Sequence, residues 1–327
     1  MRVVHVDSIH ILQLDYTDEA LLYDIVDVIN YRDTIYVYSR NFLKRFENKT
    51  GHYLGLLAES GNGEGQYSSI GRFWLSGDTF KIFDNNNGRI NCYSPSGRFL
   101  GSERQFERMP EFLGARLRPN TFFESPDSNG VYILNNYVGS VSRPTPMYTY
   151  YPDSHSSRIL EGRTLKSGAY LIDRGFTDFE HNRLLLWEGL RDTLFTIRNE
   201  RVEPLYVFDF GDYAFPKGKQ QLNELSDRIN AFMSAEDQVY ISLLRYFQSK
   251  GDFIYFSFTS NDGEIGYVRL DEVSRTCTIV SLVDGTRRYK PAGFIKIERD
   301  SAMVSLTDVA HPECNPALYK FSLNVFE

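Results

Sequence analysis

The stretch DTIYVYSRNFLKRFENKTGHYLG, residues 33–55, decides the fold, because DTFKIFDNNNGRINCYSPSGRFLG, residues 78–101, repeats its pattern. Each copy begins with a run of aromatic and β-branched residues, which favour strands. Each copy ends in a Gly-x-aromatic-Leu-Gly hairpin, where glycine supplies the positive φ that a tight turn needs. The copies are offset by 45 to 46 residues (33 to 78, and 55 to 101). A period in the forties, made of strands and turns, is typical of one blade of a β-propeller.

Weaker copies of this pattern follow along the chain. We predict them in 130–160, 183–210 and 239–283, and a sixth in 292–297, 302–306 and 316–323 joined by a strand from 3–14. Joining both ends of the chain in the last blade removes the exposed edges of a ring of sheets. The sequence therefore predicts an all-β fold, a single six-bladed β-propeller domain over 1–327 with the N-terminal strand closing the last blade.

One segment departs from the β pattern. Behind Pro216, apolar residues recur at helical spacing, at Leu222, Leu225, Ile229, Phe232 and Met233. This spacing predicts an inserted amphipathic helix at about 217–236, between the fourth and fifth blades. We expect this helix to pack on the propeller rather than to bind a partner.

The composition narrows the classes of protein. Aromatic residues make up 15% of the chain, which again favours β structure. Lys and Arg number 36 against 43 Asp and Glu, a net charge of −7. Because nucleic-acid binding depends on clustered Lys and Arg, this balance argues against a nucleic-acid partner. The cysteines Cys92, Cys277 and Cys314 lie far apart and allow at most one disulfide, and free thiols are the favoured interpretation.

The N-terminal residues 1–16 alternate apolar and polar positions and lack the continuous apolar core of a signal peptide. The most apolar stretch, 20–29, is interrupted by Asp24 and Asp27, so we predict no transmembrane segment. The chain as given is expected to be soluble. Two locations stay open from the residues alone: the cytoplasm, or an extracytoplasmic compartment reached through a targeting segment that has been removed.

The run 33–103 resembles the six-bladed β-propeller proteins of Bacteroidetes, which are similar in pattern to NHL-repeat propellers. The Gly-rich segment of that family, G-x-G-P-G-E-Y, is matched by GNGEGQY at 61–67, with Glu64 in place of Pro and Gln66 in place of Glu. The run NPALYK, 315–320, resembles the closing Asn-Pro strand of the family. The resemblance implies an exported lipoprotein of unknown biochemical role, periplasmic or attached to the outer membrane, whose signal segment has been removed.

Three short motifs suggest chemistry but fit structural loops better. The segment 61–67 lacks the following helix and the Lys-Ser/Thr pair of a phosphate cradle, so we interpret it as a connection between blades. The run DNNNG at 84–88 lacks the flanking helices and final Glu of a calcium loop, so a turn is favoured. His311, Glu313 and Cys314 lack a second pair of ligands, so a loop is favoured over zinc. We predict no metal, no cofactor and no catalytic residue.

Aromatic side chains in loops are the remaining candidates for binding. We select five residues near the Gly-rich segment and in the Tyr-rich connection 137–157: Tyr67, Arg72, Trp74, Tyr148 and Tyr150. The predicted function is a non-catalytic module that binds an oligosaccharide, a peptide or a protein of the cell envelope. The alternative is a glycan-active hydrolase or lyase with two channel-facing carboxylates, drawn from Asp33, Asp78, Asp173, Asp178 and Asp252. A purely structural role is the third hypothesis.

Overall fold

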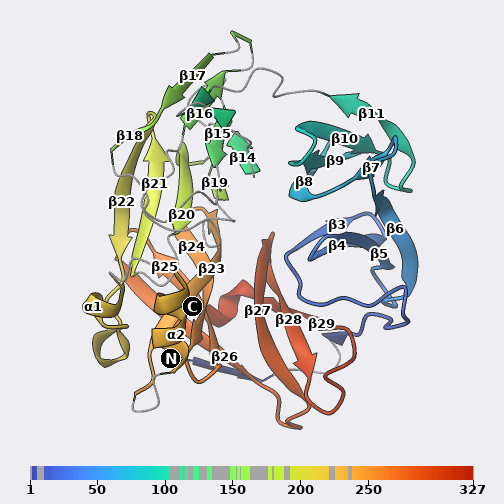
Figure 1. The fold of residues 1–327 in the computed structure, drawn as a ribbon. Helices are drawn as coiled ribbons and strands as arrows, with labels where there is room; N and C mark the ends of the chain where they lie inside the picture. The colour runs from blue at the N-terminus through green and yellow to red at the C-terminus, as the bar shows by residue number, and fades with distance from the viewer. Residues whose placement is uncertain are drawn as a thin grey trace. The chain divides into compact units, whose positions relative to one another are not determined.

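A computed structural model shows that the chain is built mainly from β-strands. It describes residues 2–5, 11–103, 111–112, 115–116, 121–124, 131–134, 148–151, 153–154, 156–162, 176–178, 180–187, 192–220, 225–234 and 238–326. The chain divides into two compact units. The first unit is Met1–Arg104 with Ile265–Glu327, and the second is Gln105–Glu264. In Figure 1 the colour follows the residue number, from blue at the N-terminus to red at the C-terminus.

The first unit contains three complete sheets. Their strands are β3 (Asp27–Tyr31), β4 (Thr34–Ser39), β5 (Phe42–Glu47), β6 (Tyr53–Ser60), β7 (Gln66–Tyr67), β8 (Ile70–Ser76), β9 (Thr79–Asp84), β10 (Arg89–Tyr93), β11 (Phe99–Glu103), β2 (Ile11–Leu12), β27 (Tyr289–Glu298), β28 (Ser301–Asp308) and β29 (Ala317–Ser322). The strand orders are β3-β4-β5-β6-β7, β11-β10-β9-β8 and β2-β29-β28-β27. The two aligned copies in the sequence therefore fold into two sheets that share four consecutive antiparallel strands, β3 to β6 in one and β8 to β11 in the other, as the repeat predicts.

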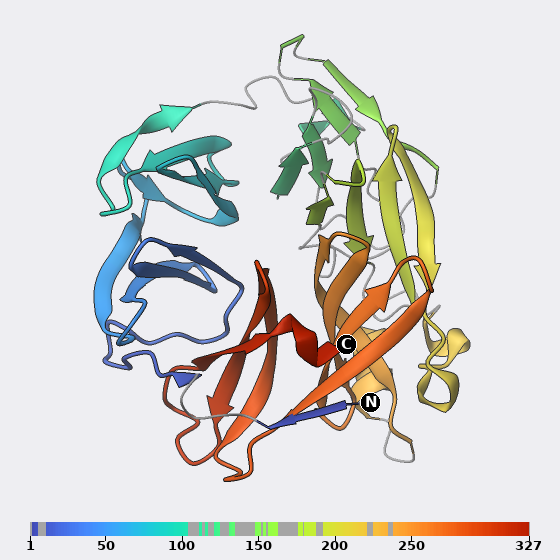
Figure 2. The same ribbon diagram turned by 180° about the vertical axis from the view of Figure 1, so that it is seen from behind.

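Both ends of the chain enter sheets of the first unit. β2 pairs with β29, with Ile11 opposite Tyr319, so an N-terminal segment completes the sheet formed by β27, β28 and β29. β1 (Arg2–His5) runs parallel to β26 (Thr276–Val283), which in turn pairs with β25 (Ile265–Asp271). Figure 2 shows β1 lying along β26, and the short helix η3 (Leu323–Phe326) ends the described chain.

The second unit contains two complete sheets. Their strands are β14 (Thr121–Glu124), β15 (Val131–Leu134), β16 (Tyr148–Tyr151), β17 (Ser156–Ile159), β18 (Glu161–Gly162), β19 (Phe176–Asp178), β20 (Arg183–Trp187), β21 (Thr193–Arg198) and β22 (Arg201–Val207). The orders are β14-β15-β16-β17 and β18-β22-β21-β20-β19. The unit also holds the pair β12 (Glu111–Phe112) and β13 (Ala115–Arg116), and the hairpin of β23 (Ile241–Lys250) and β24 (Phe253–Ser260).

In the described residues, five sheets of four or five strands each lie wholly within a single unit. Three belong to the first unit and two to the second. The predicted count of six blades is not confirmed. The boundary between the units follows Glu264 and falls inside the predicted fifth blade, 239–283, whose strands are divided into β23–β24 and β25–β26. The all-β architecture of repeated antiparallel sheets is confirmed.

The insertion after β22 is helical, but the prediction of one continuous helix over 217–236 is not confirmed. A short helix η2 (Gly211–Tyr213) comes first, followed by α1 (Lys217–Gln220) and α2 (Leu225–Met233), and 221–224 lie outside the described residues. Gly218 weakens α1, because glycine loses more backbone freedom than other residues when it enters a helix. Phe232 of α2 is buried and meets the ring of Phe215 edge-on at 5.5 Å, so α2 packs against its own unit.

An aromatic core joins the sheets β3–β7 and β8–β11, which lie side by side in Figures 1 and 2. The ring centroids of Tyr36 and Phe80 are 4.0 Å apart, and Phe73 stacks on Phe80 at 5.6 Å. All three side chains are buried. Burying a ring of this size contributes roughly 2–3 kcal/mol, so these contacts account for much of the adhesion between the two sheets.

Residues 13–26, which we call the strap, connect β2 to β3 without regular structure. Lys44 of β5 holds the strap against the sheet. Its buried ammonium group donates hydrogen bonds to the carbonyl oxygens of Glu19 (2.7 Å) and Leu21 (2.6 Å). Burial lowers the pKa of Lys44. The strap also touches the hairpin at Gly51, where a Cβ atom would lie 2.0 Å from the carbonyl oxygen of Gln13. Only glycine fits at this crossing.

Asn315 ties the strap to the loop that leads into β29. Its Oδ1 accepts a hydrogen bond from the amide of Leu22 at 2.5 Å, and its Nδ2 donates to the carbonyl oxygens of Ala20, at 2.9 Å, and Asp15. The side chain of Gln13 in turn donates to the carbonyl oxygen of Asn315 at 3.0 Å. Asn315 is 1% exposed, so water cannot replace these partners. One amide side chain therefore satisfies three strap backbone groups and joins segments about 300 residues apart.

We expect Asn315→Ala to lower the free energy of unfolding by about 3 kcal/mol, because it leaves several buried backbone groups without partners at roughly 1–3 kcal/mol each. Chemical denaturation of the purified variant measures this loss. Asn324→Ala, at an exposed position in the same unit, is the matched control and should change stability by less than about 0.5 kcal/mol. Equal stabilities of the two variants would contradict this role for Asn315.

Candidate functional site

The Gly-rich segment 61–67 connects the first two sheets, as predicted from the sequence. It runs from the end of β6 to the start of β8, and its last residues form β7, which pairs in parallel with β6 (Glu59 opposite Gln66). The amide of Gly61 donates to the carbonyl oxygen of Tyr67 at 2.8 Å, and the amide of Gly63 donates to Oε1 of Gln66 at 2.9 Å. These amides bond within the loop, whereas a phosphate cradle needs amides that face a ligand.

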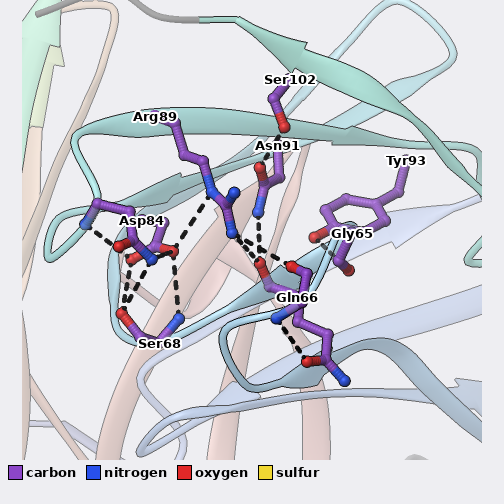
Figure 3. Close-up of polar contacts among 10 residues, drawn as sticks. Gly65, Gln66, Ser68, Asp84, Arg89, Asn91, Tyr93 and Ser102 are labelled. Atoms are coloured by element: carbon purple, nitrogen blue, oxygen red, sulfur yellow. Dashed lines mark hydrogen bonds and ion pairs between the residues drawn. The ribbon is translucent and has the colours of Figure 1, made fainter.

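The carbonyl oxygens of the loop face donors from β10 (Figure 3). The carbonyl oxygen of Gln66 accepts from Arg89 at 2.8 Å and from Asn91 at 2.9 Å. The hydroxyl of Tyr93 donates to the carbonyl oxygen of Gly65 at 3.1 Å, and burial raises the pKa of Tyr93 to about 12, so it remains a neutral donor. Ser102 of β11 completes the row by donating to Oδ1 of Asn91 at 2.7 Å. This polar row fixes the loop on the second sheet.

The DNNNG run forms a turn, as predicted, and Asp84 anchors it (Figure 3). The fully buried carboxylate accepts hydrogen bonds from the amide of Ser68 (3.2 Å), the hydroxyl of Ser68 (3.1 Å) and Nδ2 of Asn87 (2.7 Å). A calcium ion needs oxygen atoms around it, whereas the carboxylate of Asp84 is surrounded by N–H and O–H donors. Asp84 therefore positions the start of β8.

We expect Gly65→Ala to destabilise the chain by roughly 2–3 kcal/mol. Gly65 has φ +70°, and a Cβ atom there would lie 2.9 Å from Cγ of Phe99. Gly88 is the matched control: its φ is +63°, but nothing lies within 4 Å of the added atom, so Gly88→Ala should cost only about 1 kcal/mol. Thermal and denaturant unfolding measure both. Equal losses of stability in the two variants would show that the contact with Phe99 does not cause the loss in Gly65→Ala.

The structure separates the five residues predicted for binding. Tyr67 is fully buried and donates its hydroxyl to the carbonyl oxygen of Asn41 at 2.8 Å; burial raises its pKa. Tyr150, in β16, is also fully buried. Tyr148 lies in the same strand, but its side chain is outside the described residues. Arg72 and Trp74 are half-buried on one face of β8, two residues apart, and remain the candidates that could reach a ligand.

Arg72 and Trp74 form a cation–π pair, with the guanidinium carbon 5.0 Å from the centroid of the indole ring. Lys81 of β9 lies opposite Trp74 in the register and forms an ion pair with Glu103 at 3.1 Å. An aromatic ring flanked by a guanidinium and an ammonium group can stack on a flat ligand and donate hydrogen bonds to its oxygen atoms.

A second aromatic–cation pair joins the strap to the turn between β4 and β5, and no motif in the sequence points to it. The guanidinium of Arg40 stands 3.9 Å from the centroid of the Tyr23 ring, and Tyr23 is 51% exposed. Ser39 accepts a hydrogen bond from the amide of Tyr23 at 3.0 Å, which sets the strap beside the turn that carries Arg40. The exposed ring of Phe42 follows on β5. No local motif pairs Tyr23 with Arg40, because strap placement depends on Lys44 and Asn315.

The aspartates predicted as candidates for catalysis, where the structure describes them, form ion pairs or lie in exposed turns. Asp178 is buried; burial opposes its ionisation, but hydrogen bonds from Arg183 (2.8 Å), His181 (3.0 Å) and Ser249 outweigh this and lower its pKa. Asp78 is exposed and paired with Arg32 and Tyr31. Asp33 and Asp252 are exposed turn residues, and Asp173 lies outside the described residues.

The low pKa of Asp178 predicts a loss of stability in acid. Its stabilisation is present above the unfolded pKa of about 3.9 and is lost as the pH falls through the lower folded value. We expect Asp178→Asn to cost about 3 kcal/mol at pH 7, because Arg183 then lacks its buried partner, and to flatten the decline in stability below about pH 4. Urea unfolding between pH 7 and pH 3 measures both effects.

The control for this experiment is Asp227→Asn, at an exposed position of α2. It should have nearly the stability and the same acid slope as the unchanged protein. A steep acid slope retained in Asp178→Asn would assign the acid sensitivity to other carboxylates.

The run 311–314 is a loop, as predicted, but its side chains converge. One ligand atom from each of His311, Glu313 and Cys314 lies within 4.8 Å of the other two. Nδ1 of His311 is 3.2 Å from Oε1 of Glu313. The cysteines Cys92, Cys277 and Cys314 are free thiols, buried, exposed and half-buried respectively.

These sheets define a β-propeller. The chain is similar, at 13% identity and a TM-score of 0.63, to a protein of Bacteroides fragilis named as a candidate exported protein, with 95% of this chain and 94% of that chain covered. It is similar at 10% identity and a TM-score of 0.59 to a DUF4221 family member from Bacteroides vulgatus, with 95% and 94% covered. Virginiamycin B lyase from Staphylococcus aureus gives 10% identity, a TM-score of 0.54, and 96% and 98% coverage. At these identities the likeness shows the fold alone.

The chain belongs to the family described as "Domain of unknown function (DUF4934)", whose model matches residues 5–301. No curated protein matches the chain. Among the described residues, the helices are too short and too polar to cross a bilayer.

Proposed function

We propose that the protein is a non-catalytic binding module of the cell envelope that binds an oligosaccharide, a peptide or a protein of the cell envelope. The observation that carries this proposal is the cation–π pair of Arg72 and Trp74 on β8. Rigid β-sheet sites of this kind combine an aromatic face, which stacks on the apolar face of a sugar or on a peptide side chain, with guanidinium donors for hydroxyl and carboxylate oxygens.

The rigidity of the surrounding sheet supports the same proposal. Trp74 shares its face of the sheet with Lys81, its register partner, whereas the neighbouring residue Phe73 belongs to the buried aromatic core on the opposite face. Lys81 is held in turn by Glu103. A site whose side chains are already held in place loses little conformational entropy on binding, which favours affinity.

The pKa values of the carboxylates give the hydrolase or lyase alternative no comparable support. A general acid that works near neutral pH needs a raised pKa. The described carboxylates with a clear shift are all lowered, each by hydrogen bonds that outweigh any burial: Asp178, Asp271, Asp284 and Asp308. Asp308, for example, accepts hydrogen bonds from Arg288 and from the amide of Ala310, and so holds a loop.

We further propose an extracytoplasmic location, as a periplasmic or outer-membrane lipoprotein of a member of the Bacteroidetes. The family resemblance and the similarity to a candidate exported protein support this location.

Binding at Trp74 can be followed by fluorescence, because the chain has only two tryptophans. Trp187 is nearly buried, and Trp187→Phe leaves Trp74 as the sole indole reporter. We expect a ligand from a panel of neutral and uronic-acid oligosaccharides and short peptides to protect Trp74 from acrylamide quenching. Arg72→Ala should weaken that ligand about tenfold, equivalent to about 1.4 kcal/mol.

The matched control is Trp74→Phe, in which Trp187 is the only reporter and quenching should not respond to the ligand. Isothermal titration calorimetry gives affinities that do not depend on either indole. A ligand that binds Trp74→Ala and Arg72→Ala as tightly as the unchanged protein would place binding elsewhere.

A further inference from the structure

Three different metal-binding side chains meet at the exposed turn before β29. Nδ1 of His311 and Oε1 of Glu313 are already 3.2 Å apart, and the sulfur of Cys314 completes a set whose ligand atoms all lie within 4.8 Å of one another. Ligand atoms around a tetrahedral zinc ion are separated by about 3.5 Å, because the metal–ligand bonds are about 2.0–2.3 Å long. The set is therefore only slightly wider than the ligand shell of a zinc ion.

Tyr16 of the strap adds a fourth polar group to the same place. Its side chain lies beside that of Cys314. The ring is 54% exposed, so the cluster opens to solvent and a cation can reach it. The strap and the C-terminal loop therefore both contribute to the cluster.

Buried anchors on both sides hold the turn that carries the three donors. Asp308, 4% exposed, accepts a hydrogen bond from the amide of Ala310 at 3.0 Å, and Asn315 follows Cys314 directly. The amide of Cys314 donates to the carbonyl oxygen of His311 at 3.0 Å, which closes the turn. The donors are therefore presented by a fixed backbone, which reduces the entropy lost when a metal binds.

We propose that His311, Glu313 and Cys314 form a binding site for a thiophilic divalent cation of the zinc class. Imidazole nitrogen, carboxylate oxygen and thiolate sulfur are the three ligand types that zinc takes in proteins, whereas magnesium and calcium select oxygen alone. Three protein ligands leave the fourth position to water or to an incoming ligand. The site lies on different strands and loops from Arg72 and Trp74, so it stands independently of the proposed function.

Cobalt(II) tests the site directly, because a thiolate bound to cobalt gives a charge-transfer absorption in the near ultraviolet and tetrahedral cobalt gives intense visible bands. We expect the reduced protein to bind one cobalt ion with both signals and zinc(II) to displace it. Zinc alone should raise the unfolding temperature by a few degrees at saturating concentration.

The chain provides matched controls for two of the three ligands. Cys314→Ser should abolish the charge-transfer band, whereas Cys277→Ser, at an exposed cysteine elsewhere, should leave it intact. His311→Ala should weaken cobalt binding at least tenfold. His52→Ala should not, although His52 is also exposed and lies 2.8 Å from the carboxylate of Asp15.

Unchanged circular dichroism of each variant without metal shows that it is folded. A charge-transfer band that survives Cys314→Ser, or that is lost in Cys277→Ser, would overturn the proposal. The same conclusion would follow if His52→Ala and His311→Ala weakened binding equally.

Discussion

The side-chain amide of Asn315 is the interaction on which the first unit depends most. It satisfies backbone groups of Asp15, Ala20 and Leu22 at a place that is closed to water. A strap without regular structure cannot pair its own amides and carbonyls, and buried unpaired groups are costly. An amide, which both donates and accepts, is suited to this task. The position of β2 beside β29, and of β3 at the end of the strap, follows from this contact.

The same solution recurs at three other places in the first unit. Lys44 donates hydrogen bonds to carbonyl oxygens of the strap. Arg89 and Asn91 donate to a carbonyl oxygen of the Gly-rich loop. Asp84 accepts a hydrogen bond from the amide of Ser68, just before β8. Each of these polar side chains completes backbone hydrogen bonds that the strands leave open. These polar residues are therefore committed to architecture. Ligand chemistry is left to the surface, where Arg72, Tyr23 and Arg40 lie.

The parts of the fold that repeat within about 45 residues could be predicted from the sequence. The aligned runs 33–55 and 78–101 lie in two sheets that share four consecutive antiparallel strands. The Gly-rich segment forms a connection between these sheets, and the DNNNG segment forms a turn. Local patterns carry this information, because alternation and turn residues act over a few positions. The burial of Tyr67 could not be predicted in this way, since it depends on the neighbouring sheet. The pairing of Tyr23 with Arg40 could not be predicted either, because the place of Tyr23 depends on the distant residue Asn315, which bonds to the neighbouring Leu22.

The turn at 311–314 shows how a correct local prediction can miss chemistry. Counting ligands along the chain favours a plain loop, because a second ligand pair is absent from the sequence nearby. The fold instead gathers the three donors in one turn and brings Tyr16 to Cys314 from the other end of the chain. Asn315, the next residue, holds that end in place. A cation bound here would be held by residues next to Asn315, whose side chain joins the strap to the C-terminal loop. Metal affinity and closure of the strap are then thermodynamically linked: whatever weakens the Asn315 contact also weakens the metal site.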